Sequence, residues 1–138
     1  MIPADLCYED IAIGAVYEFE RLIAKEDGMR FAELTGDYSP LHTDPLFGAK
    51  SQFGKNVVHG MFAASLFSTL VGMHCPGKSA LYMSQTLQFR KPVFYGDEVI
   101  VRGTVIEKSD SIKVITLKTE ILHNGEVIIN GEAKAKVL

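Results

Sequence analysis

Residues 58–71 read VHGMFAASLFSTLV and predict the central helix of this protein. The large apolar residues recur at the three- and four-residue spacing of one helix face, namely Phe62, Leu66, Phe67, Leu70 and Val71. Small residues recur at every fourth position, namely Gly60, Ala64, Ser68 and Gly72. Because a helix that is apolar on most sides is buried, we predict a buried helix whose small-residue stripe lies close against a sheet.

Strand patterns lie on both sides of this helix. Near-alternating apolar and polar residues predict strands at 16–23, 81–93, 98–108, 113–123 and 127–138. The candidate inward-facing sets are Val99, Val101 and Val105 in one strand, and Ile115, Leu117 and Ile121 in the next. Turn residues separate the strands, and Asn124-Gly125 is a strong hairpin signal. Consecutive hairpins give an antiparallel sheet, so we expect an α+β fold with about five strands curled around one long helix.

A short helical region precedes the central helix. Residues 25–34 carry acidic residues at their start, which suits the positive end of the helix dipole, and Gly36 is a plausible stop. Asp44 followed by Pro45 reads as an N-cap and a first helical residue, which predicts a second short helix.

The loop between these helices carries the clearest chemical signal, the segment GDYSPLHTD at 36–44. Asp37 and His42 stand five positions apart with Pro40 between them. The proline removes a backbone donor and disfavours helical geometry at Ser39, so the loop is irregular and constrained. A carboxylate and an imidazole on such a loop can hold one water molecule and move its protons, which is general acid–base chemistry.

The bulk properties exclude several classes of function. At 138 residues the chain is expected to form one domain, residues 1–138. A net charge of −3 argues against nucleic acid as a partner, and no apolar run is long enough to cross a membrane. The amino terminus lacks the pattern of a secretory signal. Cys7 and Cys75 match no metal or redox spacing, so we expect reduced thiols in a cytosolic protein.

Four segments together resemble the MaoC-like, (R)-specific enoyl-CoA hydratase family, whose fold is called the hot dog. They are FAELTGD at 31–37, PLHTDP at 40–45, VHGM at 58–61 and LQFRKPV at 87–93. Ser39 stands where family members often carry Asn. The resemblance implies hydration of trans-2-enoyl-CoA to (R)-3-hydroxyacyl-CoA and the reverse dehydration, with no cofactor or metal, by a homodimer.

The resemblance also implies roles for particular residues. Asp37 and His42 would form the catalytic pair, and Gly60 would stabilise the thioester oxygen through its backbone N–H. Ser68 falls at a position that would support this pair beside the substrate. Chemistry agrees with this reading of Gly60, because backbone N–H groups at a helix start lack partners inside the helix.

Other residues near these segments have more ordinary interpretations. His59 is expected to be a structural residue that precedes the helix. Arg90, Lys91 and Lys78 are candidates for contacting the phosphates of coenzyme A.

Two other functions remain open at this point. One is an acyl-CoA thioesterase on the same fold, since a fold does not fix a function. The other is a non-catalytic subunit that binds acyl thioesters or stabilises a partner. The residues leave open whether the acyl carrier is coenzyme A or a carrier protein, and which acyl-chain length is preferred.

Overall fold

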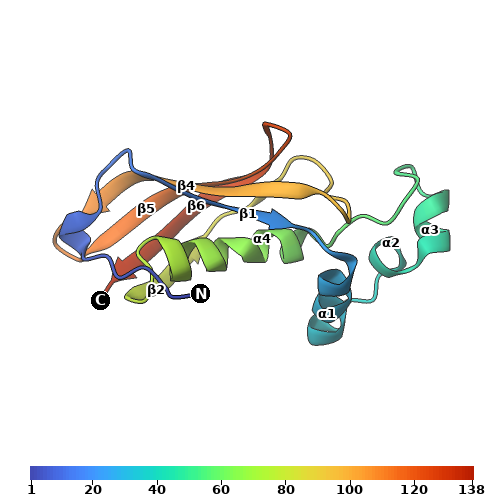
Figure 1. The fold of residues 1–138 in the computed structure, drawn as a ribbon, viewed down its shortest axis with the longest axis horizontal. Coiled ribbons are helices and arrows are strands. Elements are labelled where there is room, and N and C mark those ends of the chain that lie inside the picture. The colour runs from blue at the N-terminus through green and yellow to red at the C-terminus, as the bar shows by residue number, and fades with distance from the viewer.

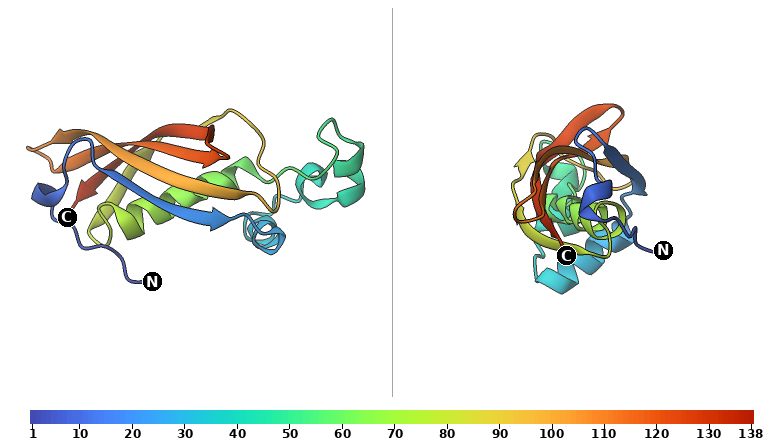
Figure 2. Two further views of the ribbon diagram at one scale, coloured as in Figure 1. Left: turned by 45° about the horizontal axis from the view of Figure 1, so that its top comes forward. Right: turned by 90° about the vertical axis from the view of Figure 1, so that its left-hand side faces the viewer.

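The computed structural model describes all residues from 1 to 138. One antiparallel sheet curls around the helix α4, Gly60–Thr69, as Figures 1 and 2 show. The strands run in the order β1-β4-β5-β6-β2, with β3 paired beside β6. Their bounds are β1 Val16–Leu22, β2 Ala80–Gln85, β3 Gln88–Phe89, β4 Glu98–Ser109, β5 Val114–His123 and β6 Glu126–Val137. The predicted α+β arrangement of a curled sheet around a helix is therefore confirmed.

The core forms where α4 meets the concave face of the sheet. All five residues of the predicted apolar stripe of α4 and its continuation are buried. They face the inward side of the sheet, where the predicted sets are buried as well, namely Val99, Val101, Val105, Ile115, Leu117 and Ile121. Gly103 in β4 allows the closest approach, because a Cβ there would lie 2.8 Å from a methyl group of Leu70. Burying this apolar stripe is what holds α4 within the sheet.

The prediction for the small-residue stripe of α4 was wrong. Ser68 is exposed, and a Cβ added at Gly72 would meet nothing within 4 Å. Ala64 and Ser68 line a pocket instead of packing on the sheet. The large apolar stripe takes the sheet-facing side because it buries more surface, and the small residues are left on the open side. The helix also ends earlier than predicted, and a π-helical turn, η2 (Leu70–His74), follows it.

The predicted strand at 81–93 was also wrong in extent. The chain leaves the sheet between β2 and β3, and both short strands pair with β6. The interruption coincides with a close crossing, because a Cβ on Gly131 would lie 1.8 Å from the carbonyl oxygen of Thr86. The Asn124-Gly125 hairpin is confirmed, and both residues have positive φ angles of 49° and 78°.

Three short helices lie beyond one end of the sheet, near the start of α4 (Figure 1). They are α1 Lys25–Thr35, α2 Pro40–Thr43 and α3 Pro45–Lys50, and a 3₁₀ turn, η1 (Tyr8–Asp10), lies near the amino terminus. Gly36 ends α1 in the left-handed conformation, and the Asp44 carboxylate accepts a hydrogen bond from the Leu46 N–H, as predicted. None of the helices is long and apolar enough to span a lipid bilayer.

Candidate active site

Asp37 lies directly after the cap of α1, at the end of the sheet where α4 begins. Its Oδ1 atom accepts a hydrogen bond of 3.1 Å from the Ser39 N–H, and about half of its side chain is exposed. Ser39 takes part through its main chain, which any residue supplies, so a serine here preserves the turn. The Oδ2 atom of Asp37 is left to face a ligand.

His42 is held in one orientation by a main-chain partner. Its Nδ1 atom lies 2.7 Å from the carbonyl oxygen of Val57. Because a carbonyl only accepts hydrogen bonds, Nδ1 carries the proton and donates it. In the neutral imidazole the Nε2 atom then has a free lone pair. His42 is thus prepared to accept a proton through Nε2.

Two further residues fix the loop that carries His42. The side-chain amide of Asn56 donates to the carbonyl oxygens of Leu41 at 2.9 Å and Asp44 at 2.8 Å. The hydroxyl of Tyr95 donates to the carbonyl oxygen of His42 at 3.2 Å. Gly28 in α1 makes room for this tyrosine, because a Cβ there would lie 2.5 Å from its ring. Burial raises the pKa of Tyr95, so its hydroxyl stays a donor.

The structure brings Asp37, His42 and His59 together. One carboxylate oxygen or ring nitrogen from each lies within 4.8 Å of the others. Two hydrogen bonds of about 2.8 Å that meet at one water molecule span about 4.5 Å. The spacing therefore fits a single water held between the carboxylate and the imidazole. The same three groups are also of the types that bind metal ions.

Gly60 is the first residue of α4 and lies next to this cluster. Its N–H belongs to the groups at a helix start that have no partner within the helix. It lines the same small cavity as His42. A Cβ at Gly60 would lie 2.9 Å from the ring of Phe89, so a larger residue here would require that ring to move. The role predicted for this N–H, donation to the thioester oxygen, stays a prediction.

An apolar pocket of about 700 Å³ opens on one side of Asp37. It lies between α1, the open side of α4 and the start of the β2–β3 segment. Its lining includes Phe31, Met61, Ala64, Ser68, Tyr82 and Leu87. Ser68, one of the predicted site residues, makes no hydrogen bond to Asp37 or His42. Burial raises the pKa of Tyr82 to about 12, and its hydroxyl contacts the side-chain oxygen of Gln85.

A second cavity of about 300 Å³ lies on the other side of the cluster, beside His42 and Gly60. Arg90 and Lys91 contribute to its lining. Lys78, the third predicted cation, follows the carboxy-terminal end of the central helix and pairs with Asp5 at 2.6 Å. It therefore lies away from the cluster on this chain.

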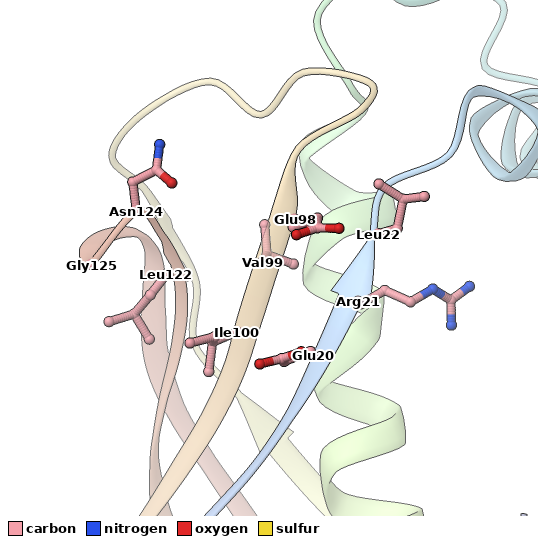
Figure 3. Close-up of a pocket in the computed structure, with 9 residues that line it drawn as sticks. All are labelled: Glu20, Arg21, Leu22, Glu98, Val99, Ile100, Leu122, Asn124 and Gly125. Carbon is pink, nitrogen blue, oxygen red and sulfur yellow. The ribbon is translucent and has the colours of Figure 1, made fainter.

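The groove in Figure 3 belongs to a different surface. It has a volume of about 390 Å³ and lies across β1, β4 and the β5–β6 hairpin. Glu98 and Ile100 in its lining alternate with the buried Val99 and Val101, so they are on the face of the sheet away from α4. Neither Asp37 nor His42 reaches this groove.

Sequence reasoning predicted Asp37, His42 and Gly60 and missed the residues that hold them. Val57 acts through a carbonyl group, which every residue has, so no sequence signal exists for it. Asn56 immediately precedes the VVHG segment, but a lone asparagine gives no hint of its partners 12 to 15 positions away. His59 was expected to be structural, and the structure places its ring against that of His42.

Comparison with known proteins agrees with this geometry. The model of the MaoC-like domain family matches residues 10–127. The chain is 38% identical over 132 residues to a 3-hydroxybutyryl-CoA dehydratase of Methylorubrum extorquens, covering 96% of this chain and 84% of that protein. It is 37% identical over 130 residues to the (R)-specific enoyl-CoA hydratase of Aeromonas caviae, covering 94% and 97% of the two chains.

The three-dimensional structures agree as well. The solved structure of the A. caviae (R)-hydratase involved in PHA biosynthesis superimposes with a TM-score of 0.91, covering 94% of this chain and 99% of that one. The fold and the cluster at the start of α4 define a hot-dog protein of the hydratase and dehydratase class. The chain belongs to the MaoC-like domain family, which confirms the predicted resemblance.

Proposed function

We propose that this protein is an (R)-specific enoyl-CoA hydratase, which adds water to trans-2-enoyl-CoA and catalyses the reverse dehydration. One observation carries the proposal: the Asp37 carboxylate and a ring nitrogen of His42 lie within 4.8 Å of each other, beside the amino terminus of α4. The names of relatives at 37–38% identity over nearly the whole chain support the same reaction.

In the proposed reaction one water molecule lies between Asp37 and His42. Its oxygen attacks carbon 3 of the enoyl group while Nε2 of His42 takes one of its protons. The Asp37 carboxylate accepts a hydrogen bond from the same water and orients it. Electrons of the double bond move toward the thioester oxygen, and His42 returns the proton to carbon 2. The water has then added across the bond from one side, and His42 is neutral again.

The thioester oxygen gains negative charge during this addition. The N–H of Gly60 and the positive end of the α4 dipole are suited to stabilise that charge. One such donor contributes about 3–4 kcal/mol to transition-state stabilisation. No metal or redox cofactor is required for this chemistry.

The two cavities divide the substrate between them. We assign the acyl chain to the 700 Å³ apolar pocket beside Asp37. The pantetheine arm would leave through the cavity beside Gly60, toward Arg90 and Lys91. Arg90 now bonds to Asn130 and Gln88, and Lys91 pairs with Glu126, so each would exchange a protein partner for a phosphate.

A homodimer is part of the proposal. Strand β2 is an edge of the sheet, and Leu81 and Met83 on it are more than half exposed. An exposed apolar edge strand favours pairing with another chain, and a second copy supplies a matching edge. The cytosolic location remains a prediction.

The test is hydration of crotonyl-CoA by the purified protein, followed as loss of the enoyl-thioester absorbance with chiral analysis of the product. The proposal predicts rapid loss and (R)-3-hydroxybutyryl-CoA. Release of free thiol without hydration would instead indicate a thioesterase. Absence of both reactions with crotonyl-CoA and with longer enoyl chains would indicate a non-catalytic subunit.

A further inference from the structure

His59 occupies an unusual position for a residue that only precedes a helix. It is the N-cap residue of α4 and only 2% exposed. Its ring lies 4.2 Å from the ring of His42, between centroids, and 5.0 Å from that of Phe31 at an angle of 61°. It therefore touches His42 directly while having almost no access to solvent or substrate.

His59 also holds the main chain of Asp37, the other member of the catalytic pair. Its Nε2 atom lies 2.9 Å from the carbonyl oxygen of Asp37. The carbonyl only accepts, so Nε2 carries a proton and donates it. The Oδ2 atom of Asp37 is farther away, at 3.9 Å, and stays free for water.

The other ring nitrogen of His59 has no polar neighbour through which a proton could pass. Its Nδ1 atom is buried and has no hydrogen-bond partner. A proton there would be a buried donor without an acceptor, next to the His42 ring that takes up charge during the reaction. Leaving such a group buried and unpaired is unfavourable. His59 is thus suited to act as a fixed donor through Nε2 rather than as a proton shuttle.

We propose that His59 is a positioning residue for the catalytic pair. Its N–H fixes the main chain that carries Asp37, and its ring face fixes the imidazole of His42, so one side chain sets the gap in which the water is held. The inference rests on the proposed hydratase reaction. A shift of about 1 Å in such a gap costs on the order of 100-fold in rate.

Three substitutions separate the two contacts of His59, and a fourth at another histidine is the control. His59→Phe keeps a ring against His42 and removes the donor to Asp37. His59→Gln keeps an N–H donor and removes the ring, and His59→Met matches glutamine in size without the donor. His74→Phe is the control, because His74 also has a buried unpartnered Nε2 and an aromatic neighbour, Phe19, but lies at the opposite end of the central helix.

Steady-state hydration of crotonyl-CoA and thermal unfolding would be measured for every variant. We expect His59→Phe to lower kcat about 10- to 100-fold with KM changed less than about twofold, since the residue does not touch substrate. His59→Gln should retain at least about tenfold more kcat than His59→Met. His74→Phe should keep wild-type turnover.

A double-substitution cycle distinguishes positioning from general support of the fold. If His59 acts through Asp37, adding His59→Phe to Asp37→Asn should cost little further activity. The inference would be overturned if His59→Phe kept a turnover close to that of the wild type. It would also be overturned if His59→Gln and His59→Met lost equal activity and the loss caused by His59→Phe added fully to that caused by Asp37→Asn. If His59→Phe does not fold, the comparison of kcat between His59→Gln and His59→Met tests the inference. An inactive wild-type protein would instead overturn the proposed function itself.

Discussion

The Nδ1 atom of His42 lies 2.7 Å from the carbonyl oxygen of Val57, and this contact assigns the proton on the imidazole. The sequence left open which member of the Asp37–His42 pair acts as the base. With the proton on Nδ1, Nε2 is the nitrogen that keeps a lone pair, and this favours His42 as the group that takes the proton from water.

Substitution of either member of the pair should lower turnover strongly without unfolding the protein. Asp37→Asn keeps an acceptor for the Ser39 N–H, and His42→Asn keeps a donor near Val57. We expect each to lower kcat by about 100- to 10,000-fold, the usual contribution of acid–base catalysis. Crotonyl-CoA hydration and thermal unfolding would be measured together. Near-normal turnover in either variant would show that the assignment is wrong.

The role of the Gly60 N–H can be isolated with two substitutions. Gly60→Ala adds a Cβ that meets Phe89, whose ring is half exposed and can move. Gly60→Pro adds the same carbon and removes the N–H. Proline suits a first helical position, and the φ and ψ of His59, −54° and 123°, suit a residue before proline. We expect kcat of the proline variant to be about 100- to 1,000-fold below that of the alanine variant. Equal values would mean that another group stabilises the thioester oxygen.

Ser68 should influence which acyl chains are accepted. It is exposed on the open side of α4 and lines the 700 Å³ pocket. Ser68→Leu should fill part of this pocket and lower kcat/KM for an eight-carbon enoyl-CoA about tenfold more than for crotonyl-CoA. Ser68→Ala, as the control, should leave the ratio of the two values unchanged. A uniform loss for both substrates in the alanine variant would favour support of the catalytic pair instead.

The two cysteines should differ sharply in reactivity. Cys75 is fully buried, and burial raises the pKa of its thiol to about 11, so it stays protonated at pH 8. Cys7 is exposed, although the nearby Asp10 carboxylate raises the pKa of its thiol as well. A disulfide exchange reagent at pH 8 should modify one thiol per folded chain, and none in Cys7→Ser. Two modified thiols before unfolding would contradict the burial of Cys75.

The direction of the pKa shift of Cys75 determines how this residue makes the folding stability depend on pH. The thiol ionises near pH 9 in the unfolded chain and near 11 in the folded one. Its contribution to stability is complete below pH 9 and is lost as the pH rises through 11. Thermal unfolding of wild type and Cys75→Ala across this range should therefore converge as the pH increases.

Removal of metal ions should leave the activity unchanged. The ring protons of His42 and His59 are directed at the carbonyl oxygens of Val57 and Asp37. The His59 nitrogen that lies 3.9 Å from the Asp37 carboxylate is the one that donates, and its other nitrogen is buried. One nitrogen of His42 and the Asp37 carboxylate are then the accessible ligands, fewer than the three protein ligands of most catalytic zinc sites. The check is turnover before and after dialysis against EDTA, with metal analysis of both samples. A loss that Zn²⁺ restores would contradict the metal-free mechanism.

Local patterns along the chain were enough for most of the fold. The alternation in β4 and β5, the helical stripe of α4 and the Asn124-Gly125 turn each depend on residues close in sequence. The proline between Asp37 and His42 likewise marked the loop that carries the proposed catalytic pair. These signals are readable because strand and helix periodicity map directly onto one buried face.

Tertiary contacts decided the rest, because they depend on groups that sequence patterns do not distinguish. The large apolar stripe and the small-residue stripe of α4 both suit burial. Only the packing of α4 on the sheet shows which of the two stripes lies against the strands. The carbonyl of Val57 selects the free nitrogen of His42, although every residue has a carbonyl. The sequence by itself determined which residues could do the chemistry. The tertiary structure decided which of their atoms face one another, since that requires chain segments 15 to 22 residues apart to meet at one end of the sheet.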